Sequence, residues 1–166
     1  MMFLTPEQAA SLVENAPRGA TIYLVGIGGC GMSALAHLLL DLGFRVAGSD
    51  LEANDFTRGL QERGATIHAG HTAAQLIEAR PMMVVYSSAV RLSNPELGAA
   101  EKAQLPVARR AVLLSALLGT QQGIAVAGMH GKTTTTALLA FALDHLSANP
   151  SFAVGACVPQ FARHAR

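Results

Sequence analysis

From residue 21 to about residue 119, short apolar runs rich in β-forming residues alternate with longer stretches that mix apolar and polar positions as helices do. The short runs predict strands, and the longer stretches predict helices. The predicted strands cover residues 21–27, 44–50, 65–70, 82–90 and 105–108. The predicted helices cover residues 32–43, 55–64, 72–80, 94–104 and 111–119. This alternation is typical of βαβ units, so the sequence predicts an α/β fold, a Rossmann-like parallel sheet with flanking helices.

The segments on either side of this alternation predict further parts. Near the N-terminus a short helix is predicted, because Thr5 can cap it, Pro6 takes its first position and Gln8 can complete a capping box. Beyond a polar linker, residues 124–128 predict a strand, followed by a loop, an apolar helix and one more strand. The expected parts are a lead-in with a helix (1–20), the Rossmann-like domain (21–119), a linker (120–122) and the incomplete start of a second α/β domain (123–166).

Composition and charge argue against several classes of function. Hydrophobic residues make up 51% of the 166 residues, enough for one full core. The formal net charge of +1 gives no electrostatic reason to expect nucleic acid or a membrane surface as a partner. No apolar run approaches the length of a membrane-spanning helix, and Cys30 and Cys157 fit neither a disulfide framework nor a zinc site. We therefore expect a cytoplasmic protein.

The first loop with candidate chemistry is GIGGCG, between a predicted strand and a predicted helix. Gly26, Gly28 and Gly31 fit the pattern GxGxxG, whose glycines permit a tight turn, close approach of a phosphate and close packing of helix on strand. The start of the helix also offers free N–H groups to an anion. Asp50 ends the next predicted strand, where a carboxylate could accept hydrogen bonds from a ribose or could serve only as a turn or cap residue. The loop predicts a phosphate or dinucleotide site.

The second loop, within AGMHGKTTTT, follows the predicted strand at residues 124–128. Its residues of the pattern GxxGKT are Gly128, Gly131, Lys132 and Thr133. This is a shortened P-loop, in which backbone N–H groups would hold the phosphates of ATP, Lys132 would neutralise their charge, and the Thr133 hydroxyl would reach Mg²⁺. Phosphoryl transfer also needs an acidic residue to hold the metal, and Asp144, the only carboxylate side chain after Lys132, lies too far along the helix. The sequence predicts an ATP site that this chain begins but does not complete.

Several segments, in this order along the chain, resemble the Mur ligases of bacterial cell-wall synthesis. They are VGIGGCGMSALA, GFRVAGSD, GATIHAGH, SSAV, NPEL, PVARRA and AGMHGKTTTTAL, between residue 22 and about residue 140. A set of co-linear motifs is more specific than either loop alone. His130, before the second glycine of the P-loop, is typical of the members that act on UDP-muramic acid itself.

The resemblance implies roles for individual residues. The Rossmann-like domain would bind a UDP-sugar through Gly28, Gly29, Cys30, Gly31, Asp50, His71 and Ser88. The following domain would bind ATP through Gly128, His130, Gly131, Lys132, Thr133 and Thr134. Within that second set, Lys132 and Thr133 would be catalytic, and Thr133 would be a Mg²⁺ ligand.

The resemblance also implies a reaction. ATP would phosphorylate the carboxylate of UDP-N-acetylmuramate, and the amine of L-alanine would attack the acyl phosphate, with Mg²⁺ screening the transferring charge. The rest of the ATP-binding domain and a third domain would lie outside this chain, which alone is expected to bind the UDP-sugar without ligase activity. The alternatives are a ligase that recycles murein tripeptide, an NAD(P)-dependent oxidoreductase, and a non-catalytic nucleotide sensor.

Overall fold

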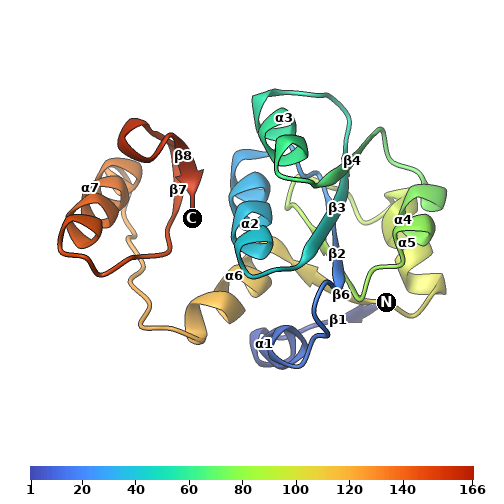
Figure 1. The fold of residues 1–166 in the computed structure, drawn as a ribbon. Helices are drawn as coiled ribbons and strands as arrows, with labels where there is room; N and C mark the ends of the chain where they lie inside the picture. Colours follow the sequence, from blue (N-terminus) through green and yellow to red (C-terminus); the bar gives the residue numbers. More distant parts are fainter.

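The computed structural model describes residues 1–166 and contains a parallel sheet of six strands with helices on both faces (Figure 1). The strands are β1 (Met2–Phe3), β2 (Thr21–Val25), β3 (Arg45–Asp50), β4 (Thr66–Ala69), β5 (Met83–Tyr86) and β6 (Pro106–Arg109). Their order across the sheet is β1-β6-β5-β2-β3-β4, and every neighbouring pair is parallel. The predicted α/β class and parallel sheet are confirmed.

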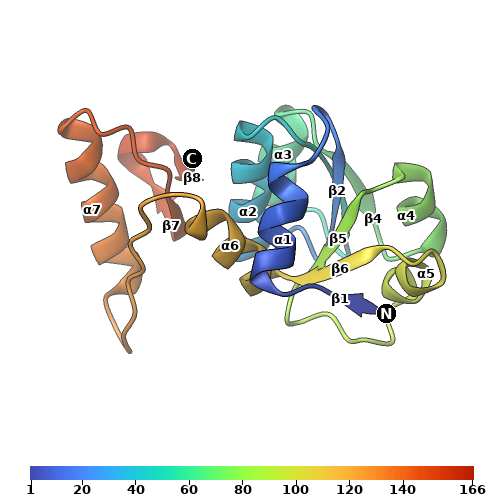
Figure 2. The same cartoon turned by 90° about the horizontal axis from the view of Figure 1, so that it is seen from below.

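Helices cover the sheet in two layers, with α1, α2, α3 and α6 on one face and α4 and α5 on the other (Figure 2). Their bounds are α1 (Pro6–Glu14), α2 (Cys30–Asp41), α3 (Asp55–Glu62), α4 (Ala73–Ala79), α5 (Pro95–Lys102) and α6 (Arg110–Gly119). The capping box predicted for the first helix is present, because Thr5 accepts from the Gln8 N–H and the Gln8 side chain accepts from the Thr5 N–H. None of the helices is both long and apolar enough to span a membrane.

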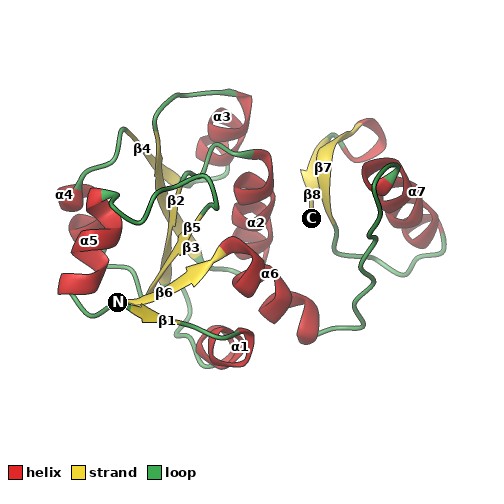
Figure 3. Cartoon of the chain, turned by 180° about the vertical axis from the view of Figure 1, so that it is seen from behind, coloured by secondary structure: helices red, strands yellow, loops and turns green.

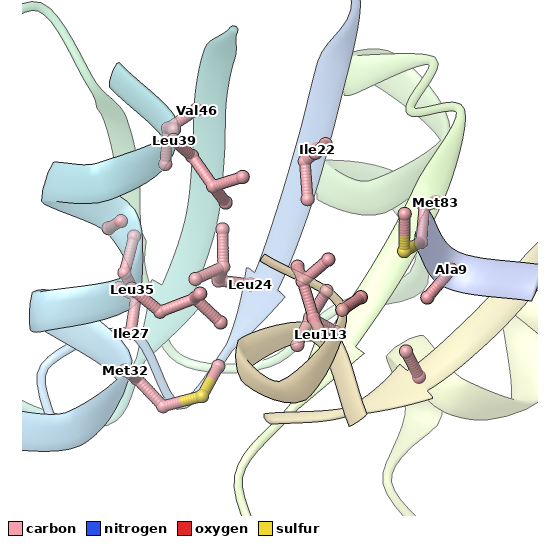
Figure 4. Close-up of a cluster of buried hydrophobic side chains, with 14 of the residues drawn as sticks. Ala9, Ile22, Leu24, Ile27, Met32, Leu35, Leu39, Val46, Met83 and Leu113 are labelled. Atoms are coloured by element: carbon pink, nitrogen blue, oxygen red, sulfur yellow. The ribbon is translucent and has the colours of Figure 1, made fainter. Parts of the chain in front are cut away.

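The alternation of side chains along β2 divides the core between the two faces. Ile22 and Leu24 belong to a cluster with side chains of α2 and α6, whereas Tyr23 belongs to the cluster against α4 and α5. Figure 4 shows the first cluster, in which Leu35 of α2 and Leu113 of α6 converge on the strand. Full burial of a side chain of this size contributes about 1.5–3 kcal/mol. The strand β2 is therefore the centre of the fold, and the glycine loop is attached directly to its carboxyl end.

The strand order reverses between β2 and β5. From β2 the chain proceeds to β3 and β4 on one side, and then returns to β5 and β6 on the other side. In open parallel sheets of this kind, ligands bind in the crevice at the carboxyl ends of the strands where the order reverses. The loop after β2, with GIGGCG, and the loop after β5, with Ser87 and Ser88, both lie at this point.

The C-terminal part of the chain contains helix α7 (Lys132–His145) and an antiparallel hairpin of β7 (Ala153–Val158) and β8 (Arg163–Ala165), joined by a 3-10 turn (Pro159–Phe161). A small cluster of Ala140, Phe152, Val154 and Val158 holds the helix and the hairpin together. Figure 3 shows the hairpin between α7 and α2, so it packs against both parts of the chain.

Two predicted elements differ from the structure, and one strand was not predicted. Residues 124–128 form no strand, because no other strand lies alongside to satisfy their backbone N–H and C=O groups. The single strand expected in the tail is a two-stranded hairpin. Residues 2–3 were not expected to be a strand, but they pair with β6 at the edge of the sheet.

Candidate functional site

The glycine loop turns sharply between β2 and α2, as its sequence predicts. Gly26 has φ of +80°, and a Cβ there would meet Val90 Cγ2 at 3.2 Å and Ser87 Cβ at 3.3 Å. Only glycine combines this backbone conformation with so little space. Helix α2 then begins at Cys30, with Gly29 as an N-cap that offers no side-chain acceptor. The loop thus brings the N-terminus of α2 to the point where the strand order reverses.

Two backbone N–H groups at this helix end lack an acceptor. The Gly28 N–H donates to Asp50 Oδ2 at 2.7 Å, and the Gly29 N–H donates to the Gly26 carbonyl at 3.3 Å. The N–H groups of Cys30 and Gly31 make no hydrogen bond, as expected in the first turn of a helix without a cap. These two N–H groups are available to an anion, whereas that of Gly28 is already engaged.

Asp50 braces the loop from the end of β3. Its Oδ1 accepts from the Leu51 N–H at 2.8 Å while its Oδ2 holds the Gly28 N–H. Asn54 adds a second brace, because its side-chain amide donates to the Gly28 carbonyl at 3.0 Å. A Cβ on Gly28 would lie 2.9 Å from Asp50 Oδ2 and 3.0 Å from Asn54 Nδ2. Gly28 is therefore needed for these braces, and Asp50 serves the loop whether or not it also contacts a ribose.

Arg110 lies directly over the start of α2, a position that sequence reasoning missed. A Cβ on Gly31 would lie 1.6 Å from Arg110 Nη1, so the absence of a side chain at Gly31 makes room for the guanidinium. Arg110 is also the first residue of α6, and neither α2 nor α6 carries an acidic residue in its first turn. The Arg110 guanidinium forms no hydrogen bond or ion pair with another side chain. A cation beside two helix N-termini is electrostatically unfavourable by itself, and an anion there would relieve it.

A buried polar cluster lies under the end of β3 and β4. Glu96 of α5 is fully buried, and it accepts from the Tyr23 hydroxyl at 2.6 Å and from Ser49 Oγ at 2.7 Å. His71 Nδ1 lies 2.9 Å from Glu96 Oε2 and 2.8 Å from Ser49 Oγ. Burial and the neighbouring Glu96 carboxylate raise the pKa of Tyr23, which keeps its hydroxyl a donor. The sequence indicated His71 alone, because its partners come from distant segments.

Two further residues predicted for the sugar site are Ser88, which is exposed, and Cys30, which is partly buried. Ser88 is exposed in the loop after β5 and makes no hydrogen bond through its side chain. The Cys30 thiol donates to the Gly155 carbonyl at 3.2 Å. Burial raises the pKa of the Cys30 thiol, and the nearby Arg110 charge only partly opposes this. Cys30 is thus a weakly nucleophilic packing residue in a loop whose backbone carries the chemistry.

The second loop also ends at an uncapped helix N-terminus. Gly131, the N-cap of α7, has φ of +77°, and Gly128 has φ of +149°. The Lys132 ammonium donates to the carbonyls of Gly128 at 2.5 Å and of Met129 at 3.0 Å, so it folds back over the loop. The first N–H groups of α7, including that of Thr133, have no acceptor. Uncapped N–H groups beside an ammonium fit the phosphates of a nucleotide.

The chain supplies little to a metal at this loop. No group of three or more His, Cys, Asp or Glu side chains could hold an ion. Asp144 pairs with Arg166 at 2.5 Å at the other end of α7, so it is no partner of Thr133. Of the predicted ATP-site residues, the structure therefore groups Gly128, Gly131, Lys132 and Thr133, and this loop offers threonine hydroxyls but no carboxylate to Mg²⁺.

The two loops approach the same residue of the hairpin. Gly155 of β7 accepts from Cys30 of the glycine loop, and a Cβ on Gly155 would lie 3.4 Å from Thr133 Oγ1 of the P-loop helix. The hairpin also contacts α2 through His164, whose ring lies edge-on to that of His37 at 5.1 Å between centroids. Strand β7 thus contacts the first turn of α2 and the first turn of α7 at the same residue.

A doubly wound parallel sheet with a glycine loop at its switch point, followed by a P-loop, is an arrangement typical of nucleotide-binding α/β proteins. The sequence model of the Mur ligase family, catalytic domain, matches residues 21–122. The chain belongs to the Mur ligase family, as its motifs predicted.

Individual relatives agree with this assignment. The UDP-N-acetylmuramate--L-alanine ligase of Myxococcus xanthus is 48% identical over 82% of this chain and 28% of its own length. The crystal structure of UDP-N-acetylmuramate-alanine ligase MurC from Thermotoga maritima matches with a TM-score of 0.82 and 34% identity, over 88% of this chain and 34% of that one. The crystal structure of the UDP-N-acetylmuramate:L-alanyl-gamma-D-glutamyl-meso-diaminopimelate ligase from Neisseria meningitides matches with a TM-score of 0.82 and 30% identity. The match covers 89% of this chain and 46% of that one. The chain spans about a third of the length of the first two relatives.

Proposed function

We propose that this chain forms the UDP-sugar-binding part, and the beginning of the ATP site, of a cytoplasmic ligase that joins L-alanine to UDP-N-acetylmuramate. The observation that carries the proposal is the convergence of the free Cys30 and Gly31 N–H groups with the unpaired Arg110 guanidinium. A diphosphate would satisfy all three at the point of the sheet where such ligands bind. The similarity to UDP-N-acetylmuramate--L-alanine ligases suggests that this diphosphate is that of UDP-N-acetylmuramate.

Each part of the chain would have its own role. Residues 21–119 would hold the UDP-sugar, with Asp50 near the ribose, His71 near the uracil and Ser88 at the switch-point crevice. Residues 123–166 would begin the central domain, which binds ATP. The remaining domains would come from segments beyond these residues, so the 166-residue chain would bind the UDP-sugar without ligase turnover.

The free N–H groups at the start of α7 and the Lys132 ammonium are donors suited to the phosphates of ATP. Bound ATP would supply the phosphoryl group that activates the muramoyl carboxylate for attack by the L-alanine amine. Lys132 would leave the carbonyls of Gly128 and Met129 and neutralise phosphate charge, while the free N–H groups of α7 hold the phosphate oxygens. Gly131 and His130 would shape the loop, and the Thr133 and Thr134 hydroxyls would face the phosphates. Thr133 would be one ligand of Mg²⁺, and this chain has no cluster of His, Cys, Asp or Glu side chains that could hold the ion by itself.

The alternatives are weaker. A ligase that recycles murein tripeptide shares the fold, but the curated relatives that are 45–49% identical are alanine ligases. The oxidoreductase alternative treats the P-loop as a coincidence, and the sensor alternative gives neither loop a reaction. The similar Mur ligase structures cover 88–89% of this chain, so similarity to them accounts for both loops together.

Isothermal titration calorimetry with UDP-N-acetylmuramate tests the proposal on the 166-residue chain. We expect saturable binding by the wild type and its loss in Gly28→Val, because a side chain there collides with Asp50 and Asn54 and closes the loop to a phosphate. Gly59→Ala is the matched control, since a Cβ at Gly59 meets nothing within 4 Å. Preferential binding of NADH over UDP, or equal binding by the Gly28→Val variant, would contradict the proposal.

A further inference from the structure

The Met129 side chain is exposed in the P-loop, beside the residue that would neutralise the phosphates. It is 87% exposed, and the Lys132 ammonium donates to the Met129 carbonyl at 3.0 Å and to the Gly128 carbonyl at 2.5 Å. A methionine side chain is unbranched and flexible, so the Met129 sulfur can reach an ammonium that is already held at its own backbone.

Exposure separates Met129 from the other methionines of the chain. Of the six, Met32 and Met83 are 1% and 0% exposed, and the second most exposed, Met2, is 54% exposed. An oxidant in solution must reach the sulfur before it can react, so the buried methionines are protected. We therefore expect Met129 to be the first methionine that a hydroperoxide oxidises.

Oxidation would give Met129 a strong hydrogen-bond acceptor. Its sulfur attacks one oxygen of the hydroperoxide, so that an S–O bond forms as the O–O bond breaks. The departing oxygen takes up the proton of the hydroperoxide and leaves as an alcohol or as water, and the sulfur is oxidised by the electron pair that the peroxide gains. A thioether sulfur is only a weak acceptor, whereas the sulfoxide product is polar and carries an oxygen.

We propose that Met129 is a hydroperoxide-sensitive oxidation site whose sulfoxide oxygen binds the Lys132 ammonium and holds it on the loop, away from the phosphates of ATP. Lys132 then has this oxygen as an acceptor in addition to the carbonyls of Gly128 and Met129, and ATP must compete with all of them. The inference rests on the proposed ATP site and adds its inhibition by oxidation. Methionine sulfoxide reductase reverses the modification and restores the loop.

Acylation of the lysine side chains tests the inference without ATP. The chain has two lysines, and Lys102 lies on α5, so its acylation rate is an internal standard for Lys132. The 166-residue chain is treated with a hydroperoxide, its thiols are reduced again, and oxidation and acylation are located by mass spectrometry. We expect Met129 to be oxidised first, and the acylation rate of Lys132 relative to Lys102 to fall about threefold, because a hydrogen-bonded ammonium releases its proton less readily. Faster oxidation of Met2, or an unchanged ratio of the two rates, would overturn the inference.

Two leucine variants locate the effect. Met129→Leu has a side chain of similar size without an oxidisable sulfur, so the treatment should leave its acylation ratio unchanged. Met2→Leu removes the other exposed sulfur and should keep the full fall in the ratio. The same fall in Met129→Leu, or its disappearance in Met2→Leu, would overturn the inference.

Calorimetry with ATP measures the consequence for the site. After oxidation of Met129, ATP should bind about 3- to 10-fold more weakly to the wild type, the effect of one exposed hydrogen bond to a charged group, and methionine sulfoxide reductase should restore the affinity. An unchanged affinity after complete oxidation of Met129 would overturn the inference. Failure of the untreated chain to bind ATP would instead contradict the proposed ATP site, and the acylation ratio would still decide whether the sulfoxide holds Lys132.

Discussion

Replacing Arg110 by alanine should change stability and ligand affinity in opposite directions. Its guanidinium lies beside the N-termini of α2 and α6 without an acidic partner, so the free protein gains nothing from its charge. A like charge at a helix end costs about 0.3–1 kcal/mol. We therefore expect Arg110→Ala to leave the midpoint of thermal unfolding unchanged or to raise it by about 1–3 °C, in a chain of this size.

The same substitution should weaken binding of the UDP-sugar. A hydrogen bond from a charged donor contributes about 1.5–3 kcal/mol, which corresponds to about a 10- to 150-fold change in Kd. Because Arg110 is partly exposed, we expect the lower half of that range. Calorimetry at two salt concentrations measures it, and the remaining affinity of Arg110→Ala should depend less on salt than that of the wild type.

Gly31→Ala provides a second route to the same result. The added Cβ would occupy the place of Arg110 Nη1 and push the flexible guanidinium aside, without forcing the backbone into a strained conformation. The two substitutions should therefore be non-additive, and the double variant should bind about as weakly as either single variant. Two losses that add, or an Arg110→Ala variant that unfolds earlier and binds UDP-N-acetylmuramate normally, would refute the assignment of Arg110 to the diphosphate.

Two further predictions concern stability. Leu113→Ala, at the centre of the first core cluster, should lower the free energy of unfolding by about 2–5 kcal/mol in urea titrations, whereas Leu146→Ala, 77% exposed, should change it by less than about 0.5 kcal/mol. Burial, with nearby His164 and Arg63, lowers the pKa of His37 to about 4, and burial also lowers that of His164. The unfolded chain therefore binds more protons than the folded chain between about pH 6.5 and pH 4, so stability should fall as pH decreases through this window. His37→Gln should make the free energy of unfolding depend less on pH between about pH 6.5 and pH 4. An unchanged dependence would show that the lowered pKa of His37 does not couple protonation to folding.

The sequence predicted the elements whose causes are local. The glycine loop, the capping box at Thr5 and the strand–helix alternation depend on neighbouring residues, and each is present in the structure. The strand expected at residues 124–128 was wrong, because a strand depends on a partner that no local pattern reveals. The same limit explains why the edge strand at residues 2–3 was missed.

In the candidate site, too, local features were predicted and long-range contacts were not. The loops themselves were found, but the side chains that surround them were not. Arg110 reaches Gly31 from a distant helix, and Glu96 meets Ser49 across 47 residues of sequence. The paired arginines of PVARRA at a strand–helix junction were the available signal for Arg110. For Glu96, the first turn of a helix is an ordinary position for an acid, so nothing in the sequence indicated that it is fully buried.

The hairpin joins the two loops through a residue without a side chain. Gly155 receives the Cys30 thiol on its carbonyl and has Thr133 Oγ1 opposite its Cα hydrogen. A methyl group at this position would make an ordinary contact with Thr133, whereas a branched side chain would push the P-loop helix away from the hairpin. In the proposed reaction, a phosphoryl group held by one loop must reach a carboxylate on the sugar held by the other. Gly155 contacts the first turn of α2 on one side and the first turn of α7 on the other, so its lack of a side chain lets both helix N-termini approach the same strand.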